Sequence, residues 1–156
     1  MNAPSAAPAA LPRITVATIV PDGGRFLFVE ETVGGGLVIN QPAGHLEPGE
    51  SLVDAAIRET LEETGWHVCP TGLVGVYHWL SPPDGRPVLR FTFAARPERH
   101  EPARPLDTGI VRALWLAADD LRDGRFRVRS PLVERCLQDF LNGQLAPLSL
   151  LPSIVR

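Results

Sequence analysis

The stretch Gly44-His45-Leu46-Glu47-Pro48-Gly49-Glu50-Ser51-Leu52-Val53-Asp54-Ala55-Ala56-Ile57-Arg58-Glu59-Thr60-Leu61-Glu62-Glu63-Thr64-Gly65-Trp66 predicts a loop followed by a helix. Two glycines and a proline favour a loop from Gly44 to Gly49. Ser51 is a good N-cap residue, and Asp54 three positions later has the spacing of a capping box. Neither Pro nor Gly follows until Gly65, which suits the left-handed residue after a helix, so we expect a helix of about 13 residues.

Helical spacing brings the carboxylates of this helix together. At about 100° per residue, Glu59, Glu62 and Glu63 share one side. The opposite side carries the residues expected to pack, namely Val53, Ile57, Thr60, Leu61 and Thr64. Three like charges at this spacing repel one another. Glu50 adds a fourth carboxylate, and oxygen ligands gathered in this way suit Mg²⁺ or Mn²⁺. For Glu-x-x-Glu-Glu alone, a solvated acidic face is the alternative interpretation.

The complete stretch resembles the Nudix box, Gly-x5-Glu-x7-Arg-Glu-U-x-Glu-Glu-x-Gly-U, in which U is a bulky aliphatic residue. The fixed positions match at the right spacing in Gly44, Glu50, Arg58, Glu59, Glu62, Glu63 and Gly65. Thr60 departs from the pattern because an aliphatic residue is expected there, which bears on packing rather than on the carboxylates. The resemblance implies an α+β Nudix fold, a mixed α/β/α sandwich in which helices flank a mixed β-sheet and the box forms a loop–helix–loop.

Length and composition indicate a single soluble domain. The chain has 156 residues, of which 44% are hydrophobic and 21% charged, and its net charge is −3. This charge offers no basic surface for a nucleic-acid polymer or an anionic membrane. No apolar run approaches the roughly 18 residues of a membrane span. We expect a disordered Ala/Pro-rich tail at 1–12, the domain at 13–145 and a C-terminal tail at 146–156. Two cysteines without metal-ligand spacing and no recognisable signal peptide favour the cytoplasm.

Outside the box, the expected order is strands, a helix, strands and a second helix. The expected strands are 13–20, 25–31, 37–39, 72–80, 88–95 and 110–116. We expect the first two to form one hairpin, and 72–80 with 88–95 to form another. The expected connections are 68–71 and the polar loop 96–107. A helical turn is expected at 119–123, and the last helix should begin at Ser130-Pro131 and end near Gly143. Beyond Gln144 no clear element is expected.

Stretches outside the box resemble the NudJ-type phosphatases within the Nudix family. They are 29–32, 40–47, 78–79, 89–91 and 129–133. Such enzymes release orthophosphate from nucleoside tri- and diphosphates, and they act on thiamine diphosphate and the diphosphate of its hydroxymethylpyrimidine precursor. The resemblance implies Mg²⁺-assisted attack of water on phosphorus, with Mn²⁺ as the alternative ion. The expected partner is a small phosphoanhydride substrate, bound by a monomer or a homodimer.

Two other functions remain open. One is a Nudix pyrophosphohydrolase that acts on ADP-ribose, dinucleoside polyphosphates or damaged nucleoside triphosphates. The other is a nucleotide-binding module without turnover. Modules of this second kind usually lose one or more carboxylates of the box, and this chain keeps all of them.

The resemblance assigns roles to the fixed positions of the box. Glu59, Glu62 and Glu63 would supply the metal-binding carboxylates, with the Gly44 carbonyl as a further ligand. One glutamate, which we take to be Glu59, would orient or deprotonate the attacking water.

The two remaining charges of the box, Glu50 and Arg58, are expected to pair across the junction of loop and helix, and we count both as catalytic residues. Many family members carry a further carboxylate just before the strand that begins here at Ile110. Gly109 stands at that position, and Asp107 lies two residues earlier. Either Asp107 replaces the missing carboxylate or fewer metal ions bind.

Substrate contacts are expected from strand residues near the box. Arg90 lies between apolar residues and is our candidate for a phosphate ligand, with a cross-strand or surface charge as the alternative. Trp79 or Tyr77 could stack on a base or pyrimidine ring, or could belong to the core. The remaining candidates for lining the cleft are His78, Gln41, Glu30 and His45.

Overall fold

The computed structural model describes residues 11–81 and 85–154. Residues 1–10 of the expected tail at 1–12 and the tip of the turn at 82–84 therefore lie outside the described residues. The strands are β1 (Arg13–Ile19), β2 (Pro21–Asp22), β3 (Arg25–Val33), β4 (Gly36–Asn40), β5 (Ala43–His45), β6 (Trp66–Ser81), β7 (Arg86–His100) and β8 (Ile110–Leu116). The helices are α1 (Leu52–Thr64) and α2 (Pro131–Leu141), and the 3-10 turns are η1 (Ala118–Leu121) and η2 (Leu148–Leu150).

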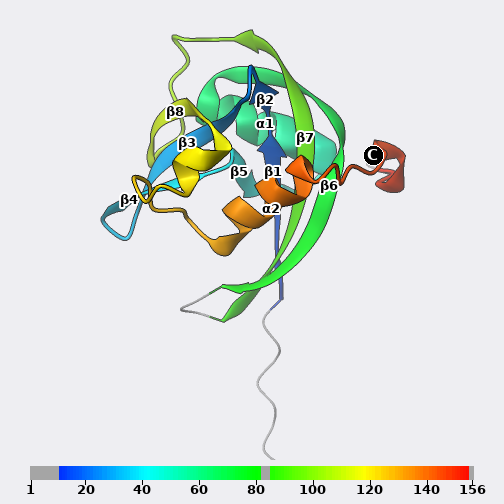
Figure 1. Cartoon of the computed structure of the whole chain (residues 1–156). Helices are drawn as coiled ribbons and strands as arrows, with labels where there is room; N and C mark the ends of the chain where they lie inside the picture. The colour runs from blue at the N-terminus through cyan, green and yellow to red at the C-terminus, as the bar shows by residue number, and fades with distance from the viewer. Residues whose placement is uncertain (1–10, 82–84, 155–156) are drawn as a thin grey trace, which may run out of the picture.

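The strands form two sheets, where a single mixed sheet was expected (Figure 1). Sheet A has the order β5-β1-β7-β6, and its β1–β7 pair is parallel. Sheet B is built around β3, which pairs with β2, β4 and β8 in antiparallel fashion. Helices α1 and α2 cover opposite faces of sheet A. The predicted α+β class with flanking helices is therefore confirmed.

The predicted first hairpin is wrong, because β1 and β3 belong to different sheets. Residues Val16 to Val20 are almost fully buried, as in a central strand covered on both faces. Strand β1 accordingly lies between β5 and β7. The turn at Gly23-Gly24 serves only the two-residue strand β2, which pairs with the beginning of β3.

The second predicted hairpin is confirmed and is longer than expected. Strands β6 and β7 pair from Trp66 opposite His100 to Ser81 opposite Arg86. The expected connection at 68–71 and the first part of the expected loop at 96–107 are therefore strand. The register shifts between His67 and Val68 and again between Pro70 and Gly72. Such bulges let an edge strand accommodate proline, which is why the sequence pattern concealed this part of β6.

Helix α1 has the predicted bounds and caps. The Ser51 side chain accepts a hydrogen bond from the Asp54 amide, and Gly65 has a φ of 71°. The predicted packing face is right in part, because Thr60 and Thr64 are buried. Val53, Ile57 and Leu61 are only half-buried, however, whereas Glu59 and Glu63 are buried. The small residues of the helix explain the difference.

Ala55, Ala56 and Thr60 bring α1 close to sheet A, where the Thr60 hydroxyl lies 2.7 Å from that of Thr18 on β1. This close approach encloses the glutamates that flank Thr60. Thr60 is thus a packing residue, as predicted for the departure from the box.

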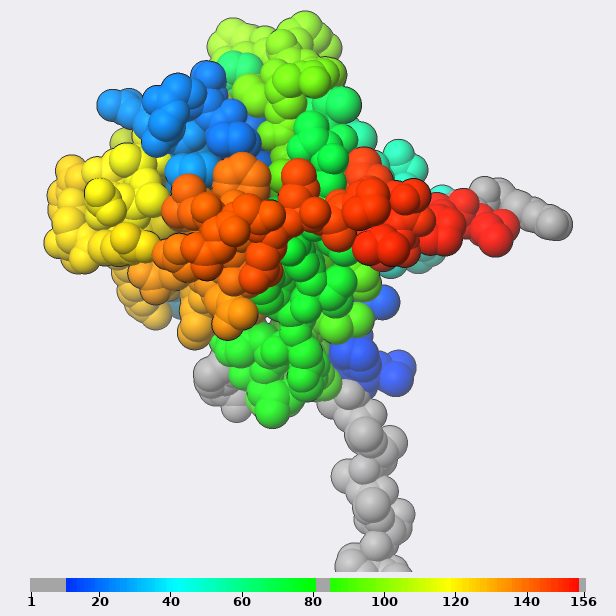
Figure 2. Space-filling model, turned by 45° about the vertical axis from the view of Figure 1, so that its right-hand side comes forward, coloured from blue at the N-terminus to red at the C-terminus, as the bar shows by residue number. Residues whose placement is uncertain are grey.

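Helix α2 begins after Ser130, with Pro131 in its first turn, and ends at Leu141, close to the predicted end. The segment that follows is not without structure, contrary to expectation. Ala146 forms a two-hydrogen-bond bridge with Leu73 of β6, and Figure 2 shows the C-terminal segment lying against β6. A Cβ atom at Gly72 would lie 2.6 Å from Leu145, so the glycine makes room for this contact. Within the described ranges, no helix has the length and apolar character that crossing a membrane requires.

Candidate active site

Arg58 ties the loop of the box to its helix. Its Nε and Nη2 atoms donate to the two carboxylate oxygens of Glu50 at 3.0 and 2.6 Å, which confirms the predicted pair. Its Nη1 atom donates to Glu59 at 2.9 Å and to Glu62 at 3.1 Å. The hydrogen bonds from Arg58 lower the pKa of Glu50. One guanidinium therefore holds three carboxylates in fixed positions.

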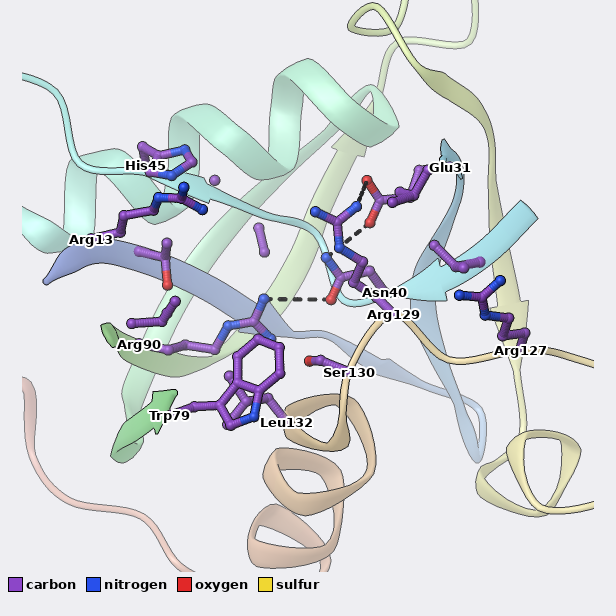
Figure 3. Close-up of a pocket in the computed structure, with 16 residues that line it drawn as sticks. Arg13, Glu31, Asn40, His45, Trp79, Arg90, Arg127, Arg129, Ser130 and Leu132 are labelled. Atoms are coloured by element: carbon purple, nitrogen blue, oxygen red, sulfur yellow. Dashed lines mark hydrogen bonds and ion pairs between the residues drawn. The ribbon is translucent and has the colours of Figure 1, made fainter. Parts of the chain in front are cut away.

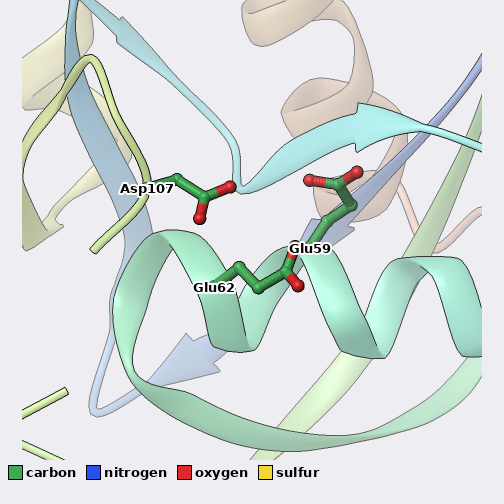
Figure 4. A group of neighbouring side chains, drawn as sticks. All are labelled: Glu59, Glu62 and Asp107. Carbon is green, nitrogen blue, oxygen red and sulfur yellow. The ribbon is translucent and has the colours of Figure 1, made fainter. Parts of the chain in front are cut away.

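Three carboxylates, Glu59, Glu62 and Asp107, form what we call the acidic cluster (Figure 4). One oxygen atom of each lies within 4.8 Å of the others. The amide of Asp107 donates to the Glu62 carbonyl at 3.1 Å, which anchors the loop to α1. The sequence left two alternatives open, replacement of the missing carboxylate by Asp107 or binding of fewer metal ions. The geometry favours the first, in which Asp107 takes the place of the carboxylate that other family members carry at the position of Gly109.

Glu63 lies next to this cluster, close enough to be affected by the charges of Glu59 and Asp107, and its carboxylate points toward β5. Its Oε2 accepts a hydrogen bond from the Ala43 amide at 2.8 Å. The pKa of Glu63 is raised to about 8, chiefly by burial. The hydrogen bond from Ala43 opposes this shift, and the charges of Glu59, Glu31 and Asp107 add to it. Burial also raises the pKa of Glu59. Buried carboxyl groups that repel one another fit a bound cation, because a divalent ion would stabilise their charged forms.

Gly44 on β5 separates the acidic cluster from the neighbouring cavity. A Cβ atom at this position would lie 2.0 Å from the Glu59 carboxyl carbon. Gly44 also lines the cavity on the other side of the strand. The fixed glycine of the box is therefore required by the close approach of Glu59 to the backbone of β5.

The cavity, which we call the basic pocket, has a volume of about 630 Å³ and opens on the face of sheet A opposite α1 (Figure 3). Four arginines and one carboxylate line it, namely Arg13, Arg90, Arg127, Arg129 and Glu31. Its apolar wall is made by Val38, Trp79, Val88 and Leu132. Ser130 at the beginning of α2 also contributes, so the positive end of a helix dipole adds to the charge of the arginines.

Arg90 is 7% exposed, and among the described residues no carboxylate lies within hydrogen-bond distance of it. Its Nη atoms approach Gln41 Oε1 and Asn40 Oδ1, both at 3.4 Å. Both amides are oriented by other partners, because Gln41 donates to the Val133 carbonyl at 2.7 Å and Asn40 donates to Glu31 at 3.2 Å. Burial lowers the pKa of Arg90. A desolvated cation thus lies beside the cavity, with two amide oxygens at 3.4 Å.

The other expected contact residues are divided between the pocket and the rest of the molecule. Trp79 and His45 line the pocket, and Gln41 lies behind Arg90. Tyr77 instead donates to Asp139 of α2 at 3.0 Å. His78 is exposed, since its neighbour Trp79 occupies the pocket face of β6.

Glu30 also lies elsewhere, where it pairs with Arg112 at 2.7 Å, while its neighbour Glu31 lines the pocket. Sequence reasoning missed Glu31, Asn40, Thr15 and Arg129. Asn40 and Glu31 could have been predicted, because each is the sequence neighbour of a residue that was predicted, Gln41 and Glu30 respectively.

Comparisons with known proteins agree with this geometry. The model of the NUDIX domain matches residues 11–136. Phosphatase NudJ of Escherichia coli (strain K12) is 41% identical over 140 residues, which are 90% of this chain and 90% of that protein. The solved structure of a NUDIX hydrolase from Nitrosomonas europaea is 44% identical, with a TM-score of 0.89 over 92% of this chain and 97% of that one. The solution structure of the E. coli ORF135 protein is 18% identical with a TM-score of 0.65, over 85% of this chain and 91% of that one, and shows likeness of fold alone.

Proposed function

This chain belongs to the Nudix family of hydrolases that act on phosphoanhydride bonds, and we propose on that premise that it is a Mg²⁺-dependent phosphatase. Its proposed substrates are nucleoside tri- and diphosphates and thiamine-type diphosphates, from which it releases orthophosphate. The 41% identity to Phosphatase NudJ supports release of phosphate rather than pyrophosphate.

One observation supports the proposal most strongly, namely that the acidic cluster and the basic pocket meet at Gly44. A substrate with a diphosphate at one end and a flat organic group at the other can occupy both. Its phosphates lie at the acidic cluster, and its organic group enters the pocket beside Trp79. The arginines at the rim of the pocket attract the negative charge of such a substrate.

Glu59, Glu62, Glu63 and Asp107 are the residues that would hold Mg²⁺, together with the Gly44 carbonyl. A bound Mg²⁺ neutralises phosphate charge and favours attack by water.

Glu59 accepts the proton of the attacking water as a new oxygen–phosphorus bond forms. The bond from that phosphorus to the bridging oxygen of the phosphoanhydride breaks, and the leaving phosphate group keeps the bridging oxygen. Arg58 keeps Glu59 in place, and Glu50 keeps Arg58 in place.

The test is to measure orthophosphate and pyrophosphate release separately in the presence of Mg²⁺. The panel contains GTP, GDP, thiamine diphosphate, hydroxymethylpyrimidine diphosphate and ADP-ribose. We expect orthophosphate from the first four, abolished by Glu63→Gln and kept by Glu134→Gln, a matched change at an exposed position of α2. Pyrophosphate from GTP, or AMP from ADP-ribose, would contradict the proposal and identify a pyrophosphohydrolase.

A further inference from the structure

Both helices α1 and α2 begin after a serine, and the two serines behave differently. Ser51 caps α1, because its hydroxyl accepts a hydrogen bond from the Asp54 amide at 3.0 Å. Ser130 precedes α2, but its side chain makes no capping hydrogen bond. A serine at this position normally accepts a hydrogen bond from the first turn of its helix. The hydroxyl of Ser130 is therefore available for another contact.

The Ser130 side chain is a buried polar group at the wall of the basic pocket. The residue is 7% exposed, and Figure 3 shows its hydroxyl turned toward Arg90. Among the described residues, this hydroxyl has no hydrogen-bond partner. It is not one of the fully enclosed side-chain atoms that lack a partner, so it can be reached from the pocket. Because buried polar groups nearly always have partners, the hydroxyl points to a ligand.

The backbone of α2 offers a second donor beside this hydroxyl. Pro131 has no amide hydrogen, and the Val133 amide donates to the Ser130 carbonyl at 3.1 Å. Within residues 11–81 and 85–154 the Leu132 amide has no acceptor, and Leu132 lines the pocket. Helix α2 has 11 residues, so its N-terminus carries a positive partial charge. An anion in the pocket would satisfy both the amide and this charge.

Arg129 brings a guanidinium group to the same end of the pocket. Its amide donates to the Ile39 carbonyl of β4 at 2.8 Å, which fixes the segment before α2 against sheet B. Its side chain lines the pocket, and its Nη1 atom donates to Glu31 at 3.3 Å. The guanidinium has five N–H donors, so this one contact leaves donors for a ligand.

These three donors suit a phosphate group. The hydroxyl, the amide and the guanidinium come from three different groups, and the tetrahedral oxygens of a phosphate can meet all of them, whereas a carboxylate has only two oxygens. The buried guanidinium of Arg90 adds positive charge to the same wall. A phosphate here lies on the pocket side of Gly44 and not at the acidic cluster.

We infer that Ser130, Arg129 and the Leu132 amide form a second anion site, which binds a phosphate group other than the phosphoanhydride that is hydrolysed. This phosphate has two sources, a phosphate monoester on the organic part of the substrate or the orthophosphate that the reaction releases. The inference goes beyond the proposed function and rests on it only for the molecule that carries or releases the phosphate.

Binding of inorganic phosphate to the metal-free, full-length protein tests the site without turnover. Calorimetric titration should show a Kd that rises about tenfold in Ser130→Ala and in Arg129→Gln, because each change removes a hydrogen bond to a charged group. Ser149→Ala and Arg25→Gln are the matched controls at exposed positions outside the pocket, and both should keep the Kd of the wild type. An unchanged Kd in Ser130→Ala, or no binding to the wild type at millimolar phosphate, would overturn the inference.

Thermal stability separates ligand binding from helix capping. Ser130→Ala should keep the Tm of the wild type, since the hydroxyl caps nothing. Ser51→Ala removes a capping hydrogen bond and should lower Tm by about 3 °C. An equal fall in Tm for Ser130→Ala would assign its hydroxyl to the helix and contradict the inference.

Kinetics distinguish the two sources of the phosphate. The test compares GDP with guanosine 3′-phosphate 5′-diphosphate in the presence of Mg²⁺. If the site binds a phosphate on the substrate, the 3′-phosphate should raise kcat/KM about tenfold, and Ser130→Ala should bring the ratio close to one. If it binds the product, the ratio is close to one in the wild type, and inhibition by orthophosphate weakens about tenfold in Ser130→Ala.

The two proposals fail in different ways. If neither nucleotide is hydrolysed but phosphate binding depends on Ser130, only the proposed function fails. If both nucleotides are hydrolysed but neither the ratio nor the inhibition changes in Ser130→Ala, only the anion site is refuted.

Discussion

The acidic cluster and the basic pocket lie on either side of one short strand, β5, and they are built in opposite ways. The acidic cluster comes from one helix and one nearby loop residue, Asp107. The pocket collects side chains from both sheets and from the beginning of α2. In the part of the chain that the structure describes, Arg58 is the cation that pairs with the acidic cluster, whereas four arginines and Glu31 line the pocket. The acidic cluster thus offers ligands for a metal ion, and the basic pocket offers arginines and an apolar wall. A substrate that carries phosphates and a ring complements both.

If the acidic cluster carries out the chemistry and the basic pocket binds the organic group, changes in the acidic cluster should affect kcat most. We expect Glu59→Gln to lower kcat about 1000-fold, with KM changed only a few fold, because the amide cannot accept the proton of water. Steady-state kinetics with GTP and Mg²⁺ test this. Glu134→Gln serves as the control at an exposed site. A large rise in KM with unchanged kcat would mean that Glu59 belongs to substrate binding instead.

The second-largest effect on kcat is expected from a methyl group at Gly44, between the acidic cluster and the basic pocket. Gly44→Ala places its Cβ 2.0 Å from the Glu59 carboxyl carbon, and the flexible end of Glu59 must move away. We expect kcat to fall about 100-fold while the protein remains folded, since a displacement of about 1 Å suffices for such a loss. Gly36→Ala is the matched control, because its new Cβ meets no atom closer than 3.5 Å. Equal activity of the two variants would show that the position of Glu59 is not critical.

The pH dependence of the free energy of unfolding should report on the carboxylates of α1 and not on the basic pocket, because it is expected to come from Glu63. Glu63 has an ordinary pKa of 4.5 when unfolded and a pKa of about 8 when folded. Between these values the folded protein binds more protons, so its free energy of unfolding falls as pH rises. For the metal-free protein we expect a loss of about 2 kcal/mol between pH 6 and pH 8.

Urea unfolding at a series of pH values measures this loss. Glu63→Gln should remove most of the slope, and saturating Mg²⁺ should reduce it, since the ion favours the charged carboxylate. Glu134→Gln should keep the slope of the wild type. A slope that survives in Glu63→Gln would assign the effect to another group.

The smallest effect is expected on the apolar wall of the pocket. Trp79→Ala should raise KM about tenfold and change kcat by less, because a ring contact contributes roughly 1 kcal/mol beyond the buried area. The neighbouring change Leu80→Ala removes a side chain that is 60% exposed and should leave both constants unchanged. If Trp79→Ala lowered kcat rather than raising KM, the two regions would not be separable in function.

The acidic side was largely predictable from sequence because its determinants are local. The caps of α1, its length and the pair of Glu50 with Arg58 depend on residues fewer than 16 positions apart. The burial of Glu59 and Glu63 was not predictable in this way. It follows from how closely α1 approaches β1, and that distance is set by the Thr18–Thr60 contact.

The basic side could not be assembled from sequence because its members lie far apart along the chain. The partner of β1 is β7, so Thr15 meets Arg90 only through a long-range parallel pairing. The choice between Glu30 and Glu31 failed for a different reason. The register of β3 with β8 shifts between these two residues, and a bulge disturbs the alternation on which strand patterns depend.

The parallel pairing of β1 with β7 also governs how fast the protein reaches its active form. It joins residues 13–19 to residues 88–94, and everything between them, including α1, lies in the loop that must close. Long-range parallel pairing is slow to form because the entropy of loop closure is lost before the contacts are gained. Helix α1 and the β6–β7 hairpin depend on short-range contacts and should appear earlier in refolding. During refolding, the helical signal should therefore return before enzyme activity does. The delay between the two is the time that β1 and β7 need to pair and to bring the acidic cluster and the basic pocket together.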